Sequence, residues 1–478
     1  MLRRTKIVAT LGPATDDPEI MRRIIAAGLD VARINFSHGD RDDQHQRVQL
    51  LRKISAECGK DVGVMGDLQG PKIRVKRFAA ASAQLVDGAR FFVDPALGDM
   101  EGNEEGVGVA YDKLHEDVKA GDVLLLNDGQ ITLSVDEVKG TRVHTTVVNG
   151  GVLSDHKGIN LKGGGLSAPA LTEKDKQDIR FAAELGMDFL AVSFVRTAED
   201  VQLARDLSRE AGGDSLIVAK IERAGAVEQI DSIIAATDAI MVARGDLGVE
   251  MGYAELTGIQ KQILRKTRKR NKVSITATQT MESMILSPIP TRAEVSDVAN
   301  AVMDGTDAVM LSAETAVGNY PVEVIEAMSD VCQGAEKHTL RKGRTTHRLE
   351  DRFQAVDEAV AMAVMYTANH MDVKAIIALT ESGSTTLWMS RIRSDIPIYA
   401  FTQHEATRRR VTLYRGVDPV AFVPQPTNMT DLYRDVFSTL LDKKLVEVGD
   451  LVLLTKGDLA GVSGGTNSMK IVKVSNDL

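Results

Sequence analysis

Eight short apolar segments, each followed by an amphipathic stretch, constrain the fold of this chain more than any other feature of its sequence. They are rich in Val, Ile and Ala and mostly lack period-two polarity, which is typical of strands buried on both faces of a parallel sheet. Helix-start signals such as Asp17 before Pro18 and Thr172 before Glu173 lie between them. Eight βα units in one chain predict an α/β fold, a closed (β/α)8 TIM barrel. The segments are Lys6–Leu11, Val31–Phe36, Val62–Leu68, Phe189–Phe194, Leu216–Ile221, Ala239–Arg244, Val273–Ala277 and Ala308–Ser312.

A stretch of different texture interrupts this series after the third apolar segment. Residues 71–167 contain short alternating strands, and Asp128-Gly129 between two of them is a strong hairpin signal. We therefore expect an inserted all-β lid domain. Glycines at its two joints, Gly70 and Gly163–Gly165, suit a hinge, although a loose linker has the same composition.

A basic, poorly periodic stretch at 337–348 predicts a further boundary. A helix pattern at 355–369 and strand patterns follow it, which predicts a C-terminal α/β domain. The expected organisation is 1–70 for the first part of the barrel, 71–167 for the lid, 168–340 for the second part of the barrel and 341–478 for the C-terminal domain.

Composition excludes several classes of protein. The formal net charge of -9 argues against sequence-independent binding of nucleic acid, which needs cations that neutralise phosphates. The two cysteines, Cys58 and Cys332, form no readable disulfide framework, and no signal peptide or apolar run of about 20 residues is present. We expect a cytoplasmic protein that neither binds nucleic acid nor enters a membrane.

Polar side chains close six of the predicted strands at the same end. Active sites of such barrels form at the carboxyl ends of the strands. Any single Lys or Glu there is usually solvated or ion-paired, and Arg33 with Asp67 is equally well explained as a structural salt bridge. Polar residues at the same end of six strands together indicate a functional site, because independent solvated residues would not be expected to converge there. The residues are Arg33, Asn35, Ser37, His38, Asp67, Lys220, Glu222, Arg244, Gly245, Asp246, Thr278, Ser312 and Glu314.

The residue types indicate the chemistry. Two carboxylates, Glu222 and Asp246, suit a magnesium ion that keeps other positions for substrate and water. Arg33, Arg74 and Lys220 add positive charge for an anion, and this combination is what phosphoryl transfer requires. Backbone N–H groups of Gly245 and Asp246 suit a carboxylate. No P-loop and no protein-kinase motif set is present.

Several of these segments, in order along nearly the whole chain, resemble the pyruvate kinase family. The resemblance implies transfer of a phosphoryl group from phosphoenolpyruvate to ADP with Mg²⁺ or Mn²⁺, giving pyruvate and ATP in glycolysis. It also implies a homotetramer regulated through the C-terminal domain. The segments are Thr5–Thr15, Ala32–Gly39, Gly66–Arg74, Ala219–Glu222, Met241–Gly248, Ala277–Gln279, Glu282–Met284 and Gly305–Thr315.

The resemblance also implies roles at the substrate. Arg33 binds the phosphate of phosphoenolpyruvate, and Lys220 stabilises the phosphoryl group in transfer. The backbone of Gly245 and Asp246, together with Thr278, binds the substrate carboxylate. Glu222 and Asp246 hold the divalent metal, and Thr278 and Ser312 lie near the path of the proton that the enolate takes up.

Further implied roles concern the nucleotide and a monovalent cation. Four residues would contact the nucleotide or its phosphates, one of them, Lys157, from the lid. A monovalent-cation site would share one of these residues, Asn35. The nucleotide positions are Asn35, His38, Arg74 and Lys157, and the monovalent-cation positions are Asn35, Ser37 and Asp67.

Two departures from the family pattern matter. Many members carry Glu at the position of Lys72 and Thr at that of Leu68, and those members need potassium. The ammonium group of Lys72 would supply the charge of that cation, so K⁺ is predicted to be dispensable. The second departure is in the loop at 380–386, where Ser382, Ser384 and Thr385 suit an effector phosphate.

An ordinary capped helix explains the loop at 380–386 equally well. The loop contains Glu381 and no Lys or Arg, so a sugar monophosphate or AMP effector is favoured over a fructose bisphosphate. Two rivals to the functional interpretation remain at this stage. One is another barrel enzyme that handles phosphoenolpyruvate or pyruvate, and the other is a catalytically retired metabolite sensor.

Overall fold

The eight apolar segments form a closed barrel of parallel strands, which confirms the predicted fold class. The computed structural model describes residues 2–340, 352–424, 429–458 and 464–475. Because the strands run parallel around the barrel, all their carboxyl ends lie at one rim. The strands are β1 (Lys6–Thr10), β2 (Val31–Asn35), β3 (Gly63–Asp67), β12 (Phe189–Val192), β13 (Leu216–Ile221), β14 (Ala239–Ala243), β15 (Val273–Ala277) and β16 (Ala308–Leu311).

The helices between these strands begin where the cap signals predict. The Asp17 carboxylate accepts hydrogen bonds from the backbone N–H groups of Glu19 and Ile20, and Thr172 and Asp175 cap each other's backbone. The barrel helices are α1 (Pro18–Ala27), α2 (Arg41–Glu57), α4 (Glu173–Glu184), α5 (Ala198–Glu210), α6 (Ala224–Glu228), α7 (Ile230–Ala236), α8 (Arg244–Met251), α9 (Tyr253–Lys269), α10 (Arg292–Asp304), α11 (Ala313–Ala316) and α12 (Pro321–Leu340), with 3-10 turns η1 (Pro13–Thr15) and η2 (Glu282–Ile285).

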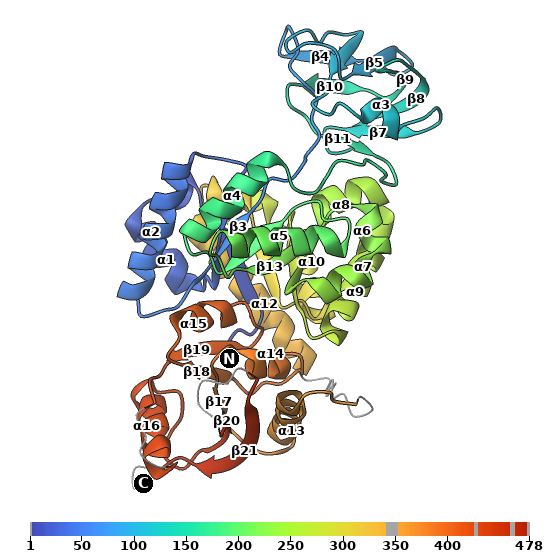
Figure 1. Cartoon of the computed structure of the whole chain (residues 1–478). Helices are drawn as coiled ribbons and strands as arrows, with labels where there is room; N and C mark the ends of the chain where they lie inside the picture. Colours follow the sequence, from blue (N-terminus) through green and yellow to red (C-terminus); the bar gives the residue numbers. More distant parts are fainter. Residues whose placement is uncertain (1, 341–351, 425–428, 459–463, 476–478) are drawn as a thin grey trace.

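One hydrophobic core closes the end of the barrel opposite this rim. Inward-facing side chains such as Val8, Met65 and Phe189 are buried in the same cluster as Ile376 and Leu413 of the C-terminal domain. The C-terminal domain lies below the barrel and the lid above it (Figure 1). The carboxyl rim is therefore the open end of the barrel.

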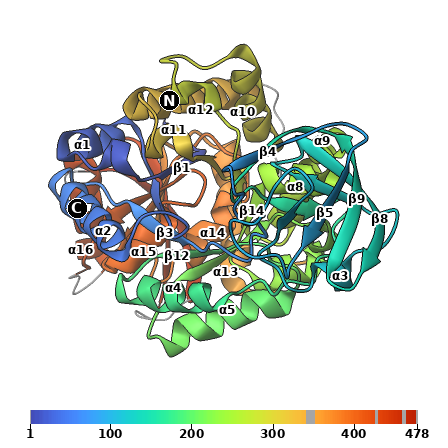
Figure 2. The ribbon, with the colours of Figure 1, turned by 90° about the horizontal axis from the view of Figure 1, so that it is seen from above.

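The inserted segment is a β-domain with one short helix, α3 (Leu114–Asp117). The predicted hairpin is confirmed: β7 and β8 are antiparallel with Leu126 opposite Ile131, and Asn127 and Asp128 have positive φ in the turn. Seen from above, the domain lies to one side, over α8 and α9 (Figure 2). Its strands are β4 (Ser82–Leu85), β5 (Arg90–Asp94), β6 (Gly106–Gly108), β7 (Val123–Leu126), β8 (Ile131–Lys139), β9 (Arg142–Asn149), β10 (Gly151–Ser154) and β11 (Ile159–Leu161).

The glycine joints of this domain are hydrogen-bonded rather than loose. Gly163, Gly164 and Gly165 have φ of 84°, 81° and 112°, a region that L side chains rarely adopt. The N–H of Gly163 donates to the carbonyl of Glu250 at 2.9 Å. At the other joint, a Cβ on Gly70 would lie 2.8 Å from Cβ of Ser193. The backbone geometry and the close approach both require glycine.

The C-terminal domain is a five-stranded sheet in the order β19-β18-β17-β20-β21, with β21 antiparallel. Three successive arginines of α15 pair with barrel carboxylates: Arg408 with Asp61, Arg409 with Asp188 and Arg410 with Asp214. The elements are α13 (Val356–His370), β17 (Ala375–Leu379), α14 (Ser384–Ser390), β18 (Ile398–Thr402), α15 (Glu405–Val411), β19 (Val417–Ala421), α16 (Met429–Asp442), β20 (Leu451–Gly457) and β21 (Thr466–Lys473).

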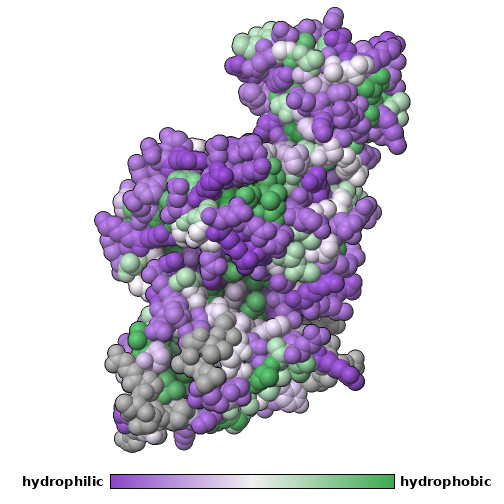
Figure 3. All heavy atoms as spheres, in the orientation of Figure 1, coloured by the Kyte–Doolittle hydropathy of each residue, from purple (hydrophilic) through white to green (hydrophobic). Residues whose placement is uncertain are grey.

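Helix α12 includes the first residues of the basic stretch at 337–348 and continues to Leu340, and residues 341–351 lie outside the described residues. Strand β19 and helices α15 and α16 were not predicted. The visible face of the molecule is mostly hydrophilic (Figure 3). Within the part of the chain that the structure describes, no helix is long and apolar enough to cross a membrane.

Candidate active site

Four charged side chains from the ends of three strands, β2, β3 and β13, meet at the barrel rim. Arg33 Nε donates to Asp67 Oδ2 at 2.6 Å. Lys220 Nζ lies 3.2 Å from Asp67 Oδ1 and 3.1 Å from Glu222 Oε1. The side chains of Asp67 and Glu222 are only 1% and 3% exposed. The predicted convergence of Arg33, Asp67, Lys220 and Glu222 is therefore present, and the Arg33–Asp67 salt bridge is part of it.

Two hydroxyl groups that sequence reasoning missed hold this cluster. Lys220 Nζ donates to Ser193 Oγ at 2.7 Å, and Ser193 Oγ donates to the carbonyl of Leu68 at 2.7 Å. Arg33 Nη1 donates to Thr10 Oγ1 at 2.9 Å. Thr10 closes β1 and Ser193 follows β12, so the strand-end position that found the charged residues could have found both.

Burial and charge act in opposite directions on these groups. Burial works to raise the pKa of Asp67, but Arg33 and Lys220 outweigh burial and leave it below its ordinary value. Burial works to lower the pKa of Lys220, but Asp67 and Glu222 outweigh burial and raise it. Lys220 is therefore a largely buried group whose ammonium form is favoured by its two carboxylate partners.

Glu222 and Asp246 supply the carboxylates for a divalent metal. Burial raises the pKa of Glu222 above its ordinary value, the charge of Lys220 opposes this shift, and the charge of Asp246 adds to it. A divalent cation between Glu222 and Asp246 would relieve the repulsion between the two carboxylates. Carboxylate oxygens are the ligands that Mg²⁺ prefers. The described residues contain no cluster of three or more metal-binding side chains, so other ligand positions fall to substrate and water. The residues fit a divalent metal ion.

The lid joint reaches the same carboxylate. Lys72 Nζ lies 3.0 Å from Asp246 Oδ1 and 3.9 Å from Asp128 Oδ1 in the β7–β8 turn. The ammonium group of Lys72 therefore contacts Asp246, one of the two candidate metal ligands, from the lid side of the barrel.

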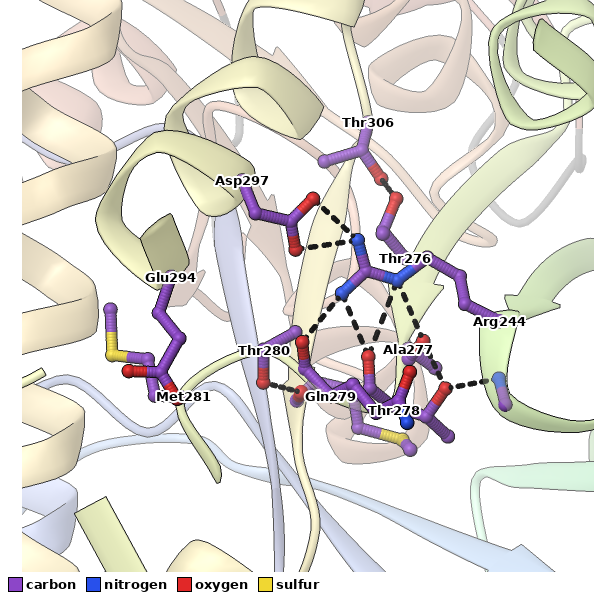
Figure 4. Close-up of polar contacts among 12 residues, drawn as sticks. Arg244, Thr276, Ala277, Thr278, Gln279, Thr280, Met281, Glu294, Asp297 and Thr306 are labelled. Atoms are coloured by element: carbon purple, nitrogen blue, oxygen red, sulfur yellow. Dashed lines mark hydrogen bonds and ion pairs between the residues drawn. The ribbon is translucent and has the colours of Figure 1, made fainter. Parts of the chain in front are cut away.

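Gly245 and Thr278 lie against each other on neighbouring strand ends. Helix α8 begins at Arg244, and the N–H of Gly245 donates to Thr278 Oγ1 at 2.9 Å. Arg244 and Asp246 both belong to the strand-end set predicted from the sequence, but the two side chains have different partners. The guanidinium of Arg244 points to Asp297 and to the backbone of the Thr278 turn (Figure 4).

Ser312 closes the eighth strand and is fixed by its own backbone. Its N–H donates to Glu314 Oε2 at 2.6 Å. Glu314 Oε1 accepts from Thr280 Oγ1 and from the N–H of Met281, both at 3.2 Å. This buried carboxylate therefore joins the ends of β15 and β16, where Thr278 and Ser312 lie.

The four nucleotide candidates are not gathered in one place. Asn35 Oδ1 accepts from the N–H of Ser37 at 3.1 Å at the end of β2, where the exposed His38 follows. Arg74 belongs to the lid side, and its Nη1 donates to the carbonyl of His156 at 2.8 Å, next to Lys157. Asn35 and His38 thus belong to the barrel, whereas Arg74 and Lys157 belong to the lid.

The three monovalent-cation candidates lie on adjacent strands. Asn35 pairs with Asp67 in the register of β2 and β3, and Ser37 follows in the next turn. Oδ1 of Asp67 is buried and lies 3.2 Å from Lys220 Nζ, so this oxygen already has a cationic partner.

The effector loop borders a cavity of about 200 Å³ in the C-terminal domain. Ser384 and Thr385 line it, whereas Ser382 does not. Thr385 Oγ1 lies 2.7 Å from Thr466 Oγ1, and Glu381 Oε2 lies 2.5 Å from His404 Nε2. The lining also contains Lys456 of β20, a cation that the loop sequence does not reveal because it lies some 70 residues away.

A candidate anion site and a candidate divalent-cation site share one barrel rim in this chain, which is the arrangement expected of a phosphotransferase that works without a P-loop. Comparison with known proteins gives the family. The profile described as "Pyruvate kinase, barrel domain" matches residues 2–325, and "Pyruvate kinase, alpha/beta domain" matches residues 358–472. The chain belongs to the pyruvate kinase family, whose members act in glycolysis and generally need a divalent metal and potassium.

Curated relatives match over nearly their whole length. Pyruvate kinase II of Salmonella typhimurium is 54% identical over 477 residues, which is 99% of each chain. Pyruvate kinases of Haemophilus influenzae and Buchnera aphidicola are 51% and 50% identical over 461 and 479 residues, which cover 96% and 99% of those relatives.

Proposed function

We propose that the barrel rim transfers the phosphoryl group of phosphoenolpyruvate to ADP, giving pyruvate and ATP. The observation that supports this most is the position of Lys220, an ammonium ion between Asp67 and Glu222 and beside Arg33. Buried charges fixed before the reaction stabilise a transferring phosphoryl group without reorganisation.

Arg33 binds the phosphate of phosphoenolpyruvate, and Lys220 stays on the phosphoryl group as it moves. Asp67 and Ser193 hold these cations in place through the hydrogen bonds described above. A magnesium or manganese ion, held by Glu222 and Asp246, would supply further positive charge to the phosphate. The metal-binding role of these two carboxylates rests on the donor set and on their mutual repulsion.

The backbone N–H groups of Gly245 and Asp246 and the hydroxyl of Thr278 orient the substrate carboxylate. The start of α8 supports this role, because N–H groups at a helix start are available to anions. Thr278 and Ser312 lie on the path of the proton that converts the enolate to pyruvate.

The nucleotide is held between the barrel and the lid. Asn35 and His38 contact it from the barrel, and Arg74 and Lys157 contact it from the lid. This assignment requires residues 71–167 to move as one body toward the rim. The assigned division of the chain, with barrel parts at 1–70 and 168–340 and a regulatory domain at 341–478, rests on the changes of sequence pattern at these boundaries.

The finer cofactor and partner assignments follow from Lys72 and from the C-terminal cavity. The ammonium group of Lys72 beside Asp246 makes K⁺ dispensable, even though Asn35, Ser37 and Asp67 are present. A sugar monophosphate or AMP binds at Ser384 and Thr385, which line the cavity, and at Ser382 of the same loop. A homotetrameric assembly and a cytoplasmic location complete the proposal.

A lactate-dehydrogenase-coupled assay with phosphoenolpyruvate, ADP and magnesium tests the proposed function. We expect turnover that requires all three. A phosphoenolpyruvate-handling lyase or mutase would consume phosphoenolpyruvate without ADP, and a retired sensor would bind it without turnover. Either result contradicts the proposal.

A further inference from the structure

We infer that Arg244 is a positioning residue, which holds the backbone turn of Thr278 and Gln279 in the shape that presents Thr278 to the substrate carboxylate. This inference rests on the proposed carboxylate-binding role of Gly245 and Thr278. It adds a residue to the machinery that contacts no substrate itself.

The guanidinium of Arg244 donates to three successive carbonyl groups. Nη2 lies 2.7 Å from the carbonyl oxygen of Thr278 and 3.0 Å from that of Gln279, and Nε lies 3.3 Å from that of Ala277. Nη1 lies 2.8 and 2.6 Å from the two carboxylate oxygens of Asp297 on α10 (Figure 4). Its planar set of donors is thus filled by one backbone turn and one carboxylate.

That turn has a backbone conformation that needs support. Thr278 and Gln279 have φ of 65° and 50°, the left-handed region that residues with a Cβ rarely adopt. Two such residues in succession at the end of β15 bring the carbonyls of 277–279 toward one point. The peptide carbonyls carry partial negative charge, so a cation at that point stabilises the strained turn.

Arg244 connects both halves of the carboxylate site. It is the first residue of α8, and its neighbour Gly245 donates its N–H to Thr278 Oγ1 at 2.9 Å. The side chain of Arg244 fixes the backbone of Thr278, while the main chain of Arg244 places Gly245. Loss of the guanidinium should therefore displace the threonine hydroxyl from the N–H group with which it acts.

The guanidinium is buried and its charge is balanced by a carboxylate of α10. Arg244 is 6% exposed, and Asp297 neutralises it from α10. The positive charge of Arg244 therefore interacts with the carbonyl groups of the turn and with Asp297, and it does not add to the anion-binding charge of Arg33 and Lys220. This separates a positioning role from direct substrate binding.

Kinetics of the full-length enzyme test the inference. Arg244→Met should raise KM for phosphoenolpyruvate at least about tenfold and leave KM for ADP within about twofold. Arg244→Lys should have an intermediate effect. Gln279→Gly, at an exposed side chain, lets residue 279 adopt positive φ at no steric cost, so adding it to Arg244→Met should recover at least about threefold of the loss.

A matched control is available at the opposite end of the barrel. Arg205 Nη1 lies 2.8 Å from Asp238 and its Nη2 lies 2.8 Å from the carbonyl of Ala236. Arg205→Met removes the same kinds of bond far from the rim, so it should lower thermal stability and leave both KM values within about twofold.

Three results would overturn the inference. They are an unchanged KM for phosphoenolpyruvate in Arg244→Met, an equal rise in both KM values, and no recovery on adding Gln279→Gly. If Arg244→Met does not fold, Asp297→Asn decides, since an unchanged KM for phosphoenolpyruvate there also contradicts it. Turnover by the unmodified enzyme and the effect of Thr278→Val report separately on the proposed function.

Discussion

The barrel rim and the C-terminal cavity both contain polar groups that suit a phosphate, but they are built differently. At the rim, Lys220 contacts Asp67, Glu222 and Ser193 within 3.2 Å, and the carboxylates are buried. The cavity has about 200 Å³ of space, and its lining combines hydroxyl groups with Lys456, Glu381 and Asp458. Charged side chains that are already held in place suit the stabilisation of a reacting group, whereas an open cavity suits a ligand that binds reversibly. Substitutions that separate the two sites test this contrast.

The largest effect is expected at the centre of the rim. Lys220→Met should lower turnover by about a thousandfold or more, because the transferring phosphoryl group loses its fixed counter-charge. Binding of Mn²⁺, measured at a pH where Glu222 is ionised, should persist because Glu222 and Asp246 remain. Lys176→Met on α4, where the lysine pairs with Glu173, is the control. Turnover within tenfold of the parent would contradict the role of Lys220.

A smaller effect is expected at the carboxylate end of the rim. Thr278→Val should lower kcat/KM for phosphoenolpyruvate by about a hundredfold, because it removes the hydroxyl that we propose binds the carboxylate and serves the proton path. Thr278→Ser keeps the hydroxyl and should stay within about fivefold of the parent. Steady-state kinetics of the two variants make the comparison, and equal losses would show that the hydroxyl is not used.

The cavity should respond without involving the rim. Lys456→Met should abolish activation by a sugar monophosphate or AMP, a coupling of about tenfold, and leave unactivated turnover within about twofold. Its Nζ lies 3.5 Å from Asp458 in the cavity, whereas Lys473 lies outside it and Lys473→Met is the control. Strong activation by fructose 1,6-bisphosphate would defeat the effector assignment, and retained activation in Lys456→Met would place the phosphate elsewhere.

The smallest effect is expected from potassium. In potassium-free tetramethylammonium buffer, added KCl should raise turnover less than about tenfold, a barrier change below about 1.4 kcal/mol. Lys72 already places an ammonium group 3.0 Å from Asp246. Lys72→Glu should convert the enzyme to one that KCl activates strongly. A strong potassium requirement of the parent would contradict the proposal that the Lys72 ammonium group replaces a monovalent cation.

The barrel was predictable because its pattern is local and repeated. Eight apolar segments, with helix caps such as Asp17 and Thr172 between them, are expected to form a closed barrel of parallel strands. Polar residues that end parallel strands must then gather at one rim. The C-terminal domain was harder to predict. Strand β19 (Val417–Ala421) contains Pro419 and Asp418, which weaken a strand pattern, so it was missed.

The sequence alone determined which charged residues meet at the rim, because the register of parallel strands converts position along the chain into position around the barrel. Only the tertiary structure decided which partner each of them takes. Arg244 stands two residues from Asp246 yet pairs with Asp297, and Lys456 joins a cavity formed by a distant loop. Partner choice depends on the direction of each side chain and on what packs beside it, and contacts between residues far apart in the chain set both.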